Sequence, residues 1–245
     1  MEILTINIFK LLVIFLVAYA GGLFVKYKKI RVNYTRKVNH FFLFFAPSLI
    51  DKFFMSGRPT SSFWLGEGIF FLGSFLIFIN PIRKRVFFIA TAFSSFDRPE
   101  DRPYTLIWYI MQEAAGYLIV IPAIAIYEKL NIAYLFSIPV LISVFGDGLA
   151  EPVGVLFGRH RYLTRAIFSK KRYLRTLEGS YMVFTASVVI LCFFFKCFSF
   201  NQFILAALTI PLAATLTEAF APHTLDNPLI ILVIFINVLL IKRFF

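Results

Sequence analysis

Two carboxylates lie in a glycine-rich segment that directly follows an apolar run. Asp147 and Glu151 are four residues apart, so they share a face if the segment is helical. Paired carboxylates suit Mg²⁺, which prefers oxygen ligands and bridges to phosphates. Gly154 and Gly158 extend roughly the same stripe and let a ligand come close, although a small-residue helix-packing face explains them equally well. The segment is therefore a candidate metal and phosphate site.

The basic segment that follows is a second candidate for phosphate binding. Its end, Thr176-Leu177-Glu178-Gly179-Ser180, leads into the next apolar run, where we expect Ser180 to be the helix N-cap. Helix N-termini bind phosphate, whereas contact with anionic lipid explains part of the positive charge. The segment is not a P-loop, because the chain lacks Gly-x-x-x-x-Gly-Lys-Ser/Thr. The seven basic residues are Arg159, Arg161, Arg165, Lys170, Lys171, Arg172 and Arg175.

A third cluster surrounds the next turn. Glu218 ends an apolar run on the membrane face that also holds Asp147. Ionisable residues within membranes are costly, so we expect Glu218 to be functional. Asp226 and Asn227 precede Pro228, which predicts a turn in which one of them caps the last helix with Pro228 at its first position.

A fourth cluster, Arg36, Lys37 and His40, stands at the start of the second apolar run. Interfacial anchoring explains it, and His40 is also suited to contact phosphate or a lipid hydroxyl. Glu67 and Glu113 lie deeper within apolar runs, and we assign them no role.

The composition indicates the elements that must position these residues. Of 245 residues, 60% are hydrophobic and 16% are charged, and the mean hydropathy is +0.81. Soluble domains are roughly 45–50% apolar, and disordered segments are poorer still, so both classes are excluded. We expect one integral membrane domain over residues 1–245. The net charge of +12 fits the positive-inside rule and contact with anionic lipid rather than nucleic acid.

Hydropathy predicts an all-α, multi-pass membrane protein with about eight transmembrane helices. Residues 86–96 form an 11-residue apolar run that is too short to cross. With that run as a surface or re-entrant segment, the positive-inside rule places the basic loop of about 158–180 in the cytosol and both termini outside. A signal peptide is the alternative for the first run. The expected spans are 6–25, 38–54, 63–79, 105–127, 132–145, 181–200, 203–216 and 228–241.

The order of these motifs resembles the polyprenol kinase family, which comprises dolichol kinases, phytol kinases and CTP-dependent diacylglycerol kinases. It runs Arg-Lys-x-x-His, then Gly-Asp-Gly-x-Ala-acid-x-x-Gly-x-x-x-Gly, then a basic loop ending in Glu-Gly-Ser. The last motif in this order is Glu-x-x-x-Pro followed by Asp-Asn. The match is spread over residues 36–227 and is densest over 146–180 and 216–228. Four motifs in this order on so apolar a chain make the resemblance fairly specific.

The resemblance implies a membrane enzyme with a cytosolic active site that transfers the γ-phosphate of CTP to the hydroxyl of an isoprenoid alcohol. It implies that Asp147 and Glu151 belong to the nucleotide and Mg²⁺ site and that Glu218 completes the pocket, and we expect Asp147 and Glu218 to be the catalytic residues. Arg36, Lys37 and His40 would contact lipid or phosphate. The residues implied in nucleotide binding are Gly146, Gly148, Glu151, Gly154, Lys170, Lys171, Arg175, Thr176, Glu178, Gly179, Ser180, Asp226 and Asn227.

Three positions depart from the family pattern. Glu151 stands where the family often has Asp, and Arg175 stands where Lys is expected, so both keep their charge. Leu225 stands where a second Asp often precedes Asp226-Asn227, which removes one carboxylate. Two other functions stay open: CMP transfer from CTP to phosphatidate, and transport of an anion or lipid without catalysis. Composition does not distinguish dolichol, polyprenol, phytol and diacylglycerol as acceptors.

Overall fold

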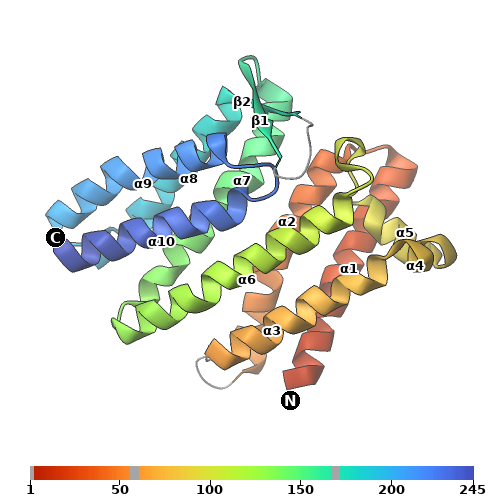
Figure 1. Cartoon of the computed structure of the whole chain (residues 1–245), viewed down its shortest axis with the longest axis horizontal. Helices are drawn as coiled ribbons and strands as arrows, with labels where there is room; N and C mark the ends of the chain where they lie inside the picture. Colours follow the sequence, from red (N-terminus) through yellow and green to blue (C-terminus); the bar gives the residue numbers. More distant parts are fainter. Residues whose placement is uncertain (1–2, 56–60, 167–171) are drawn as a thin grey trace. The chain divides into compact units, whose positions relative to one another are not determined.

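The structure is a computed structural model that describes residues 3–55, 61–166 and 172–245. The described chain is mainly helical, as expected of an all-α membrane protein, with one β-hairpin in addition (Figure 1). The helices are α1 Ile3–Lys28, α2 Val32–Phe54, α3 Ser61–Ser74, α4 Asn80–Arg85, α5 Phe87–Ser94, α6 Thr105–Lys129, α7 Ser137–Phe157, α8 Leu177–Phe193, α9 Phe200–Phe220 and α10 Asp226–Phe244. The strands are β1 Arg161–Arg165 and β2 Arg172–Thr176.

Five helical stretches of the described chain are long and apolar enough to cross a membrane. They are α1, α6, α9, α10 and the stretch Ala133–Phe157 that contains α7. The expected count of eight is not confirmed. The apolar helices Phe63–Phe78 and Leu177–Phe193 are shorter, and α2 contains four charged side chains: Arg36, Lys37, Asp51 and Lys52. The chain is therefore a multi-pass membrane protein with five clear candidate spans.

The chain divides into two compact units, residues 1–114 and 115–245, with the boundary inside α6. In the N-terminal unit, α1 packs against α2 and α5. Phe78, Phe93 and Phe96 form an aromatic core there. The eight residues of α5 span about 12 Å, which agrees with the expectation that this run does not cross. The expected single membrane domain over 1–245 stays a prediction.

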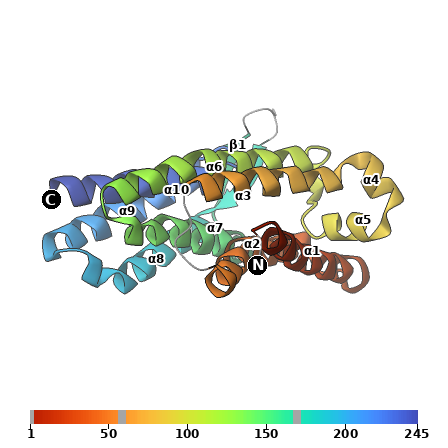
Figure 2. The same cartoon turned by 90° about the horizontal axis from the view of Figure 1, so that it is seen from below.

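The C-terminal unit is a closed four-helix bundle. Helix α7 packs on α8, α8 on α9, α9 on α10 and α10 on α7, and the four helices run side by side in Figures 1 and 2. Fully buried residues of all four helices, Ile142, Val183, Ile210 and Ile234 among them, form the core. Tyr127 of α6 is also fully buried and donates a hydrogen bond to the Phe235 carbonyl of α10, at 3.0 Å. Packing within the bundle therefore holds the helix ends in place, and the candidate residues lie near these ends.

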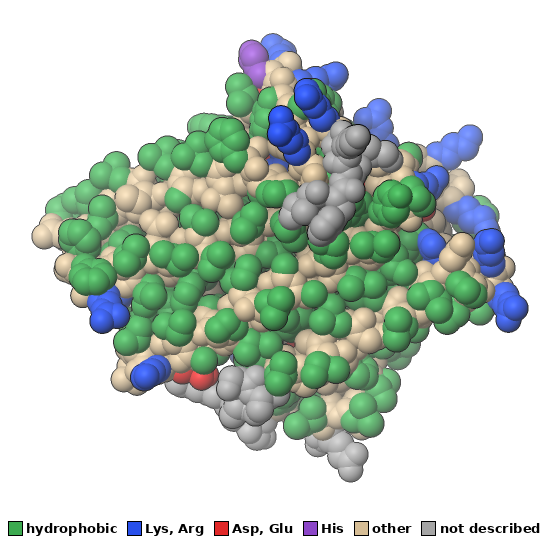
Figure 3. Space-filling model, in the orientation of Figure 1, with side chains coloured by type: hydrophobic (Ala, Val, Ile, Leu, Met, Phe, Trp, Pro, Cys, Tyr) green, Lys and Arg blue, Asp and Glu red, His purple; other side chains and the backbone are tan. Residues whose placement is uncertain are grey.

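The segment expected as a basic loop contains the β-hairpin. Strands β1 and β2 pair antiparallel, with Tyr162 opposite Arg175 and Leu163 opposite Leu174. Side chains alternate between the two faces of a strand, so Tyr162 and Arg175 share the inner face. The outer face carries the exposed Arg161, Arg165 and Arg172, and Lys and Arg side chains gather around the hairpin in Figure 3. Lys170 and Lys171 lie outside the described residues.

Candidate active site

Helix α7 continues well beyond the point where the fifth apolar span was expected to end. The span was predicted to stop at Phe145, but the helix runs to Phe157, so Asp147 lies within it and Glu151 follows one turn later. Because this segment is helical, Asp147 and Glu151 share a face of α7, as expected from their spacing. Asp147 is buried, with 7% of its surface exposed, because α10 packs against this side of α7.

Glycines allow α7 and the start of α8 to interlock. A Cβ atom on Gly154 would lie 2.6 Å from Thr176 Oγ1, and one on Gly158 would lie 2.5 Å from Thr176 Cγ2. A Cβ atom on Gly179 would lie 2.8 Å from the Ala150 carbonyl oxygen. These contacts account for the glycines by helix packing, which was the alternative to a ligand-binding role. A Cβ atom on Gly146 would lie 3.2 Å from Val183 Cγ1 of α8, and Gly148 is buried in the same helix as Gly146.

Asn227 joins α10 to α7. Its Nδ2 donates to Asp147 Oδ2 at 3.0 Å, and its Oδ1 accepts from Ser143 Oγ at 2.8 Å. Helix α10 begins at Asp226, with Leu225 at the N-cap position and no side-chain cap. The prediction that Asp226 or Asn227 caps this helix is therefore wrong. The physical reason is that the Asn227 amide bonds to the facing helix, while Asp226 Oδ1 accepts from the backbone N–H of Asn227 at 3.1 Å.

Arg175 joins the hairpin to α9 and α10. Its Nη1 donates to Glu218 Oε1 at 2.8 Å and its Nη2 to Asp226 Oδ2 at 3.1 Å. Burial opposes the charge of the guanidinium, but the charges of Asp226 and Glu218 outweigh it and raise the pKa of Arg175. Arg175 therefore stays a cation, and its planar fork holds two carboxylates from two helices.

Ser180 links Glu218 to the hairpin. Its Oγ donates to Glu218 Oε2 at 2.8 Å and shares a 2.7 Å hydrogen bond with the Tyr162 hydroxyl. Burial, followed by the nearby Glu218 charge, raises the pKa of Tyr162. The prediction that Ser180 is the N-cap is wrong because α8 begins earlier, at Leu177. Thr176 is the N-cap, and its Oγ1 accepts from the Gly179 N–H at 3.1 Å.

These contacts form one continuous hydrogen-bonded network, which we call the polar network. It runs from Asp147 through Asn227 and Asp226 to Arg175, and from there through Glu218 and Ser180 to Tyr162. It lies where α8 and α10 begin and where α9 ends. Two helix N-termini at one place favour bound anions, and the adjacent helix C-terminus favours a cation.

Glu178 closes the base of the hairpin. Its Oε1 accepts from the backbone N–H of His160 at 3.2 Å and lies 2.9 Å from Nδ1 of the same residue. Its own backbone N–H and the hydrogen bond with the His160 ring lower the pKa of Glu178 to about 2. The carboxylate therefore holds the residue before β1 against the first turn of α8.

Three residues that we expected to contact lipid or phosphate lie in the N-terminal unit. Arg36, Lys37 and His40 are on α2, Lys37 is buried, and the His40 ring packs edge-on against Phe44 at 5.1 Å. Their role in phosphate or lipid contact stays a prediction.

Three residues of this region were not identified from the sequence. Ser143 precedes Asp147 by one helical turn, and this spacing was a signal available for it. Tyr162 faces Arg175 only through the strand register. Thr224 has a left-handed backbone, with φ at 74°, and its buried Oγ1 has no hydrogen-bond partner within the described chain. A β-branched residue in this conformation is strained, and such strain often marks functional loops.

The donor set suits Mg²⁺ bound together with phosphate. The described residues contain no group of three or more His, Cys, Asp or Glu side chains that would hold a metal alone. Asp147 and Glu151 supply two carboxylates on one face of α7. One or two carboxylates plus substrate phosphates are the usual ligands of Mg²⁺, so these residues fit the ion in a nucleotide complex.

Comparison with known proteins adds no relative: no family model, curated protein or solved structure matches this chain.

Proposed function

We propose that the protein is a CTP-dependent lipid kinase that phosphorylates an isoprenoid alcohol such as dolichol, a polyprenol or phytol. One observation carries the proposal. Six residues that the family resemblance marks, between Asp147 and Asn227, join one hydrogen-bonded network in a membrane protein. The marked residues in the network are Asp147, Arg175, Ser180, Glu218, Asp226 and Asn227.

The nucleotide phosphates are assigned to the hairpin end of the bundle. The N-terminal ends of α8 and α10 favour anions there, and Arg175 supplies a charged fork suited to phosphate oxygens. Incoming phosphate competes with Glu218 and Asp226 for the guanidinium. The choice of CTP over ATP rests on the resemblance alone.

Asp147 and Glu151 would hold Mg²⁺ with the bound nucleotide. The ion would neutralise phosphate charge, which phosphoryl transfer requires more than covalent catalysis. Asn227 keeps the Asp147 carboxylate in place through its 3.0 Å hydrogen bond. We therefore assign Asn227 a positioning role.

In the proposed reaction the acceptor oxygen attacks the γ-phosphorus of CTP. A bond forms between that oxygen and phosphorus, and the bond from phosphorus to the β,γ-bridging oxygen breaks, so CDP leaves. A carboxylate, either Glu218 or Asp147, orients the hydroxyl and accepts its proton. Arg175 stabilises the charge on the transferring group. The products are a lipid phosphate and CDP.

We place the site at the cytosolic face of the membrane. Arg161, Arg165 and Arg172 are exposed on the outer face of the hairpin, and cytoplasmic loops are enriched in Lys and Arg. CTP is a soluble substrate, whereas the acceptor resides in the bilayer.

The test supplies γ-labelled CTP or ATP to the purified protein in detergent with Mg²⁺. The acceptors are phytol, geranylgeraniol, a polyprenol, dolichol and diacylglycerol, and label in the lipid phase is measured. Label from CTP in an isoprenoid alcohol, with release of CDP, is the expected result. Pyrophosphate release with phosphatidate would support CMP transfer instead. Uptake into vesicles without nucleotide turnover would support transport.

Asp147→Asn is the companion variant. It keeps the shape of the side chain but removes the charge, so we expect lipid phosphorylation to be abolished while the protein stays folded. Glu128→Gln, which neutralises an exposed carboxylate at the end of α6, is the matched control and should keep full activity. Near-normal turnover of Asp147→Asn would contradict the proposed mechanism.

A further inference from the structure

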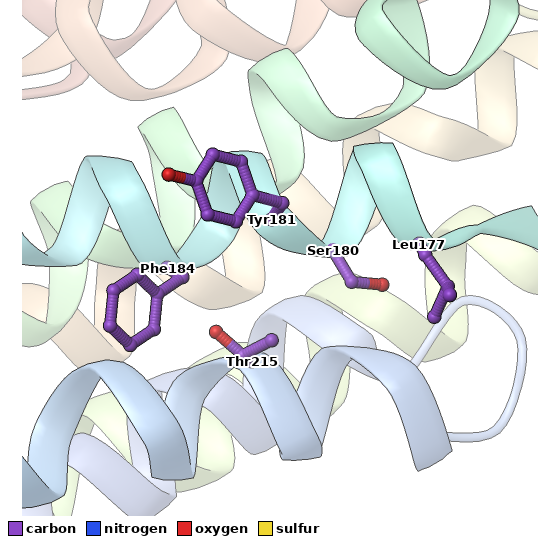
Figure 4. A pocket seen from close by; sticks show the side chains of 5 residues that line it. All are labelled: Leu177, Ser180, Tyr181, Phe184 and Thr215. Atoms are coloured by element: carbon purple, nitrogen blue, oxygen red, sulfur yellow. The ribbon is translucent and has the colours of Figure 1, made fainter. Parts of the chain in front are cut away.

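An open apolar groove of about 330 Å³ runs between α8 and α9. Leu177, Ser180, Tyr181 and Phe184 line it from α8, with the spacing of one helix face, and Thr215 lines it from α9. Figure 4 shows Ser180 and Phe184 pointing from α8 toward α9, and Thr215 pointing back toward α8. The volume lies at the lower end of the roughly 300–1,000 Å³ usual for ligand sites.

The groove has one polar end that connects to the polar network. Ser180 lines the groove and also donates its Oγ hydrogen bond to Glu218 Oε2 at 2.8 Å. Glu218 follows Thr215 by three residues, so both lie on the same side of α9. The Thr215 hydroxyl is bonded to the Pro211 carbonyl at 2.7 Å. Ser180 is therefore the lining residue that connects the groove to the polar network, and the buried Glu218 carboxylate lies directly behind it.

The remainder of the groove faces an apolar environment. Tyr181 is 66% exposed, and α9 is one of the five helices able to span the membrane. Leu212 and Leu216 of α9 are exposed as well. A ligand with a long hydrocarbon tail can therefore occupy the groove while its tail continues into the bilayer.

The charge at the polar end favours a neutral head group. Glu218 is a buried carboxylate, and its cationic partner Arg175 is shared with a second carboxylate, Asp226. The three side chains together carry one net negative charge. Arg175 is the cation assigned to the nucleotide phosphates, so a lipid that already bears a phosphate would meet the Glu218 carboxylate without a cation of its own. A hydroxyl, in contrast, can donate a hydrogen bond to a carboxylate.

We propose that this groove is the acceptor site, and that it takes the head-proximal hydrocarbon of an uncharged long-chain alcohol. The alcohol hydroxyl then lies at Ser180 and Glu218, which makes Glu218, rather than Asp147, the group that accepts its proton. This assignment rests on the proposed kinase function and adds the place in the fold where its acceptor binds. Asp147 is instead committed to Asn227 and to the nucleotide.

Filling the groove tests the assignment. Thr215→Phe places an aromatic ring between α8 and α9, and we expect it to raise KM for the alcohol at least tenfold while KM for CTP changes less than twofold. Thr209→Phe is the matched control. Thr209 lies on the same helix and also bonds to a carbonyl one turn earlier, Leu205 at 2.8 Å, but it does not line the groove. It should leave both constants near the wild-type values.

A second measurement does not depend on turnover. A diazirine-bearing isoprenoid alcohol is photolysed on the wild-type protein, and the labelled peptides are mapped by mass spectrometry. We expect label on residues 177–184 or 211–218, and we expect geranylgeraniol to compete for it. The matching hydrocarbon without a hydroxyl, and geranylgeranyl phosphate, should compete at least tenfold more weakly.

The two proposals fail in different ways. If the wild-type protein phosphorylates alcohols but Thr215→Phe behaves like Thr209→Phe and the label lies elsewhere, the groove assignment is overturned and the kinase stands. If no alcohol is phosphorylated but the label falls on α8 and α9 with the expected competition, the kinase proposal fails and the alcohol site stands. Equal competition by the phosphate would contradict the preference for a neutral head group.

Discussion

A buried cation held by two carboxylates occurs in each of the two units, and the surroundings of the two clusters differ. In the N-terminal unit, Lys10 of α1 pairs with Asp51 of α2, with 2.6 Å between Nζ and Oδ1, and with Glu67 of α3. The Lys10 side chain is completely buried. One ammonium group thus connects three helices, and it is the cation that balances both carboxylates.

The C-terminal cluster has the same charges but more partners. Besides Arg175, Glu218 accepts a hydrogen bond from Ser180, and Asp226 lies in the first turn of α10, where the helix dipole favours a negative charge. Each carboxylate would therefore keep a stabilising partner if Arg175 moved to a ligand. From this difference we expect the Lys10 cluster to hold helices together and the Arg175 cluster to be able to exchange partners.

Lys10→Met should have the largest effect on stability. It leaves Asp51 and Glu67 buried without their cation, which costs about 3–5 kcal/mol of unfolding free energy. Thermal unfolding in detergent measures the loss. The triple variant Lys10→Met, Asp51→Asn, Glu67→Gln removes all three charges and should recover most of the stability. A single variant as stable as wild type would show that this cluster does not hold the helices.

Arg175→Met is the matched change in the other cluster. We expect a loss of activity of about 100-fold, roughly 2.7 kcal/mol in transition-state stabilisation, with a smaller stability loss than for Lys10→Met. Lipid phosphorylation and thermal unfolding are measured on the same preparations. Arg175→Lys, which keeps the charge but not the fork, should fall between. A loss of stability equal to that of Lys10→Met, with activity kept in the folded fraction, would make the two clusters equivalent.

Thr224→Gly should separate strain from function in the loop before α10. Glycine relieves the left-handed backbone and removes a buried hydroxyl, so we expect a gain of about 1 kcal/mol in stability. If the strain positions Asp226, activity falls about tenfold at the same time. Asn131→Gly, at a second left-handed residue with φ of 57°, is the control and should leave activity unchanged. A stabilised Thr224→Gly variant with full activity would assign the strain no function.

Glu178→Gln should give the smallest effect, and one that depends on pH. Folding lowers the pKa of Glu178 from 4.5 to about 2, so its stabilising contribution is complete above pH 4.5 and is lost as the pH falls toward 2. The difference in melting temperature between wild type and Glu178→Gln should therefore shrink from pH 5 to pH 3. A difference that is constant over this range would mean that the charge of the Glu178 carboxylate does not contribute to stability.

The sequence identified residues that lie together in the polar network, but it predicted parts of their local structure wrongly. The spacing of Asp147 and Glu151 correctly implied a shared helix face once the helix was in place. Ser180 was wrongly expected as a cap because hydropathy locates a helix start only to within about a turn, whereas Thr176 bonds the Gly179 N–H. The hairpin was not predicted because Leu163 and Leu174 lie on its exposed face, so the strands lack the alternation of apolar and polar residues that indicates a half-buried strand.

The partners of charged residues within apolar helices depend on tertiary packing, which one sequence does not specify. Glu67 was recognised as a carboxylate inside a span, but its contact with Lys10 requires α1 to lie against α3. Tyr162 reaches Ser180 only because the register places it opposite Arg175. The expected count of eight spans is not confirmed for a related reason, since α2 contains charged residues at both ends and is not among the five clear candidate spans.

The close packing of α7 against the start of α8 also allows the two to be joined by an engineered disulfide bond. A Cβ atom built on Gly154 lies 3.8 Å from the Cβ atom of Thr176, which is the usual separation across a disulfide bond. The double variant Gly154→Cys, Thr176→Cys can therefore be oxidised to tie the hairpin base to the bundle and reduced to release it. Lipid phosphorylation measured in the oxidised and in the reduced form would then show whether the proposed activity requires the hairpin base to move against the bundle.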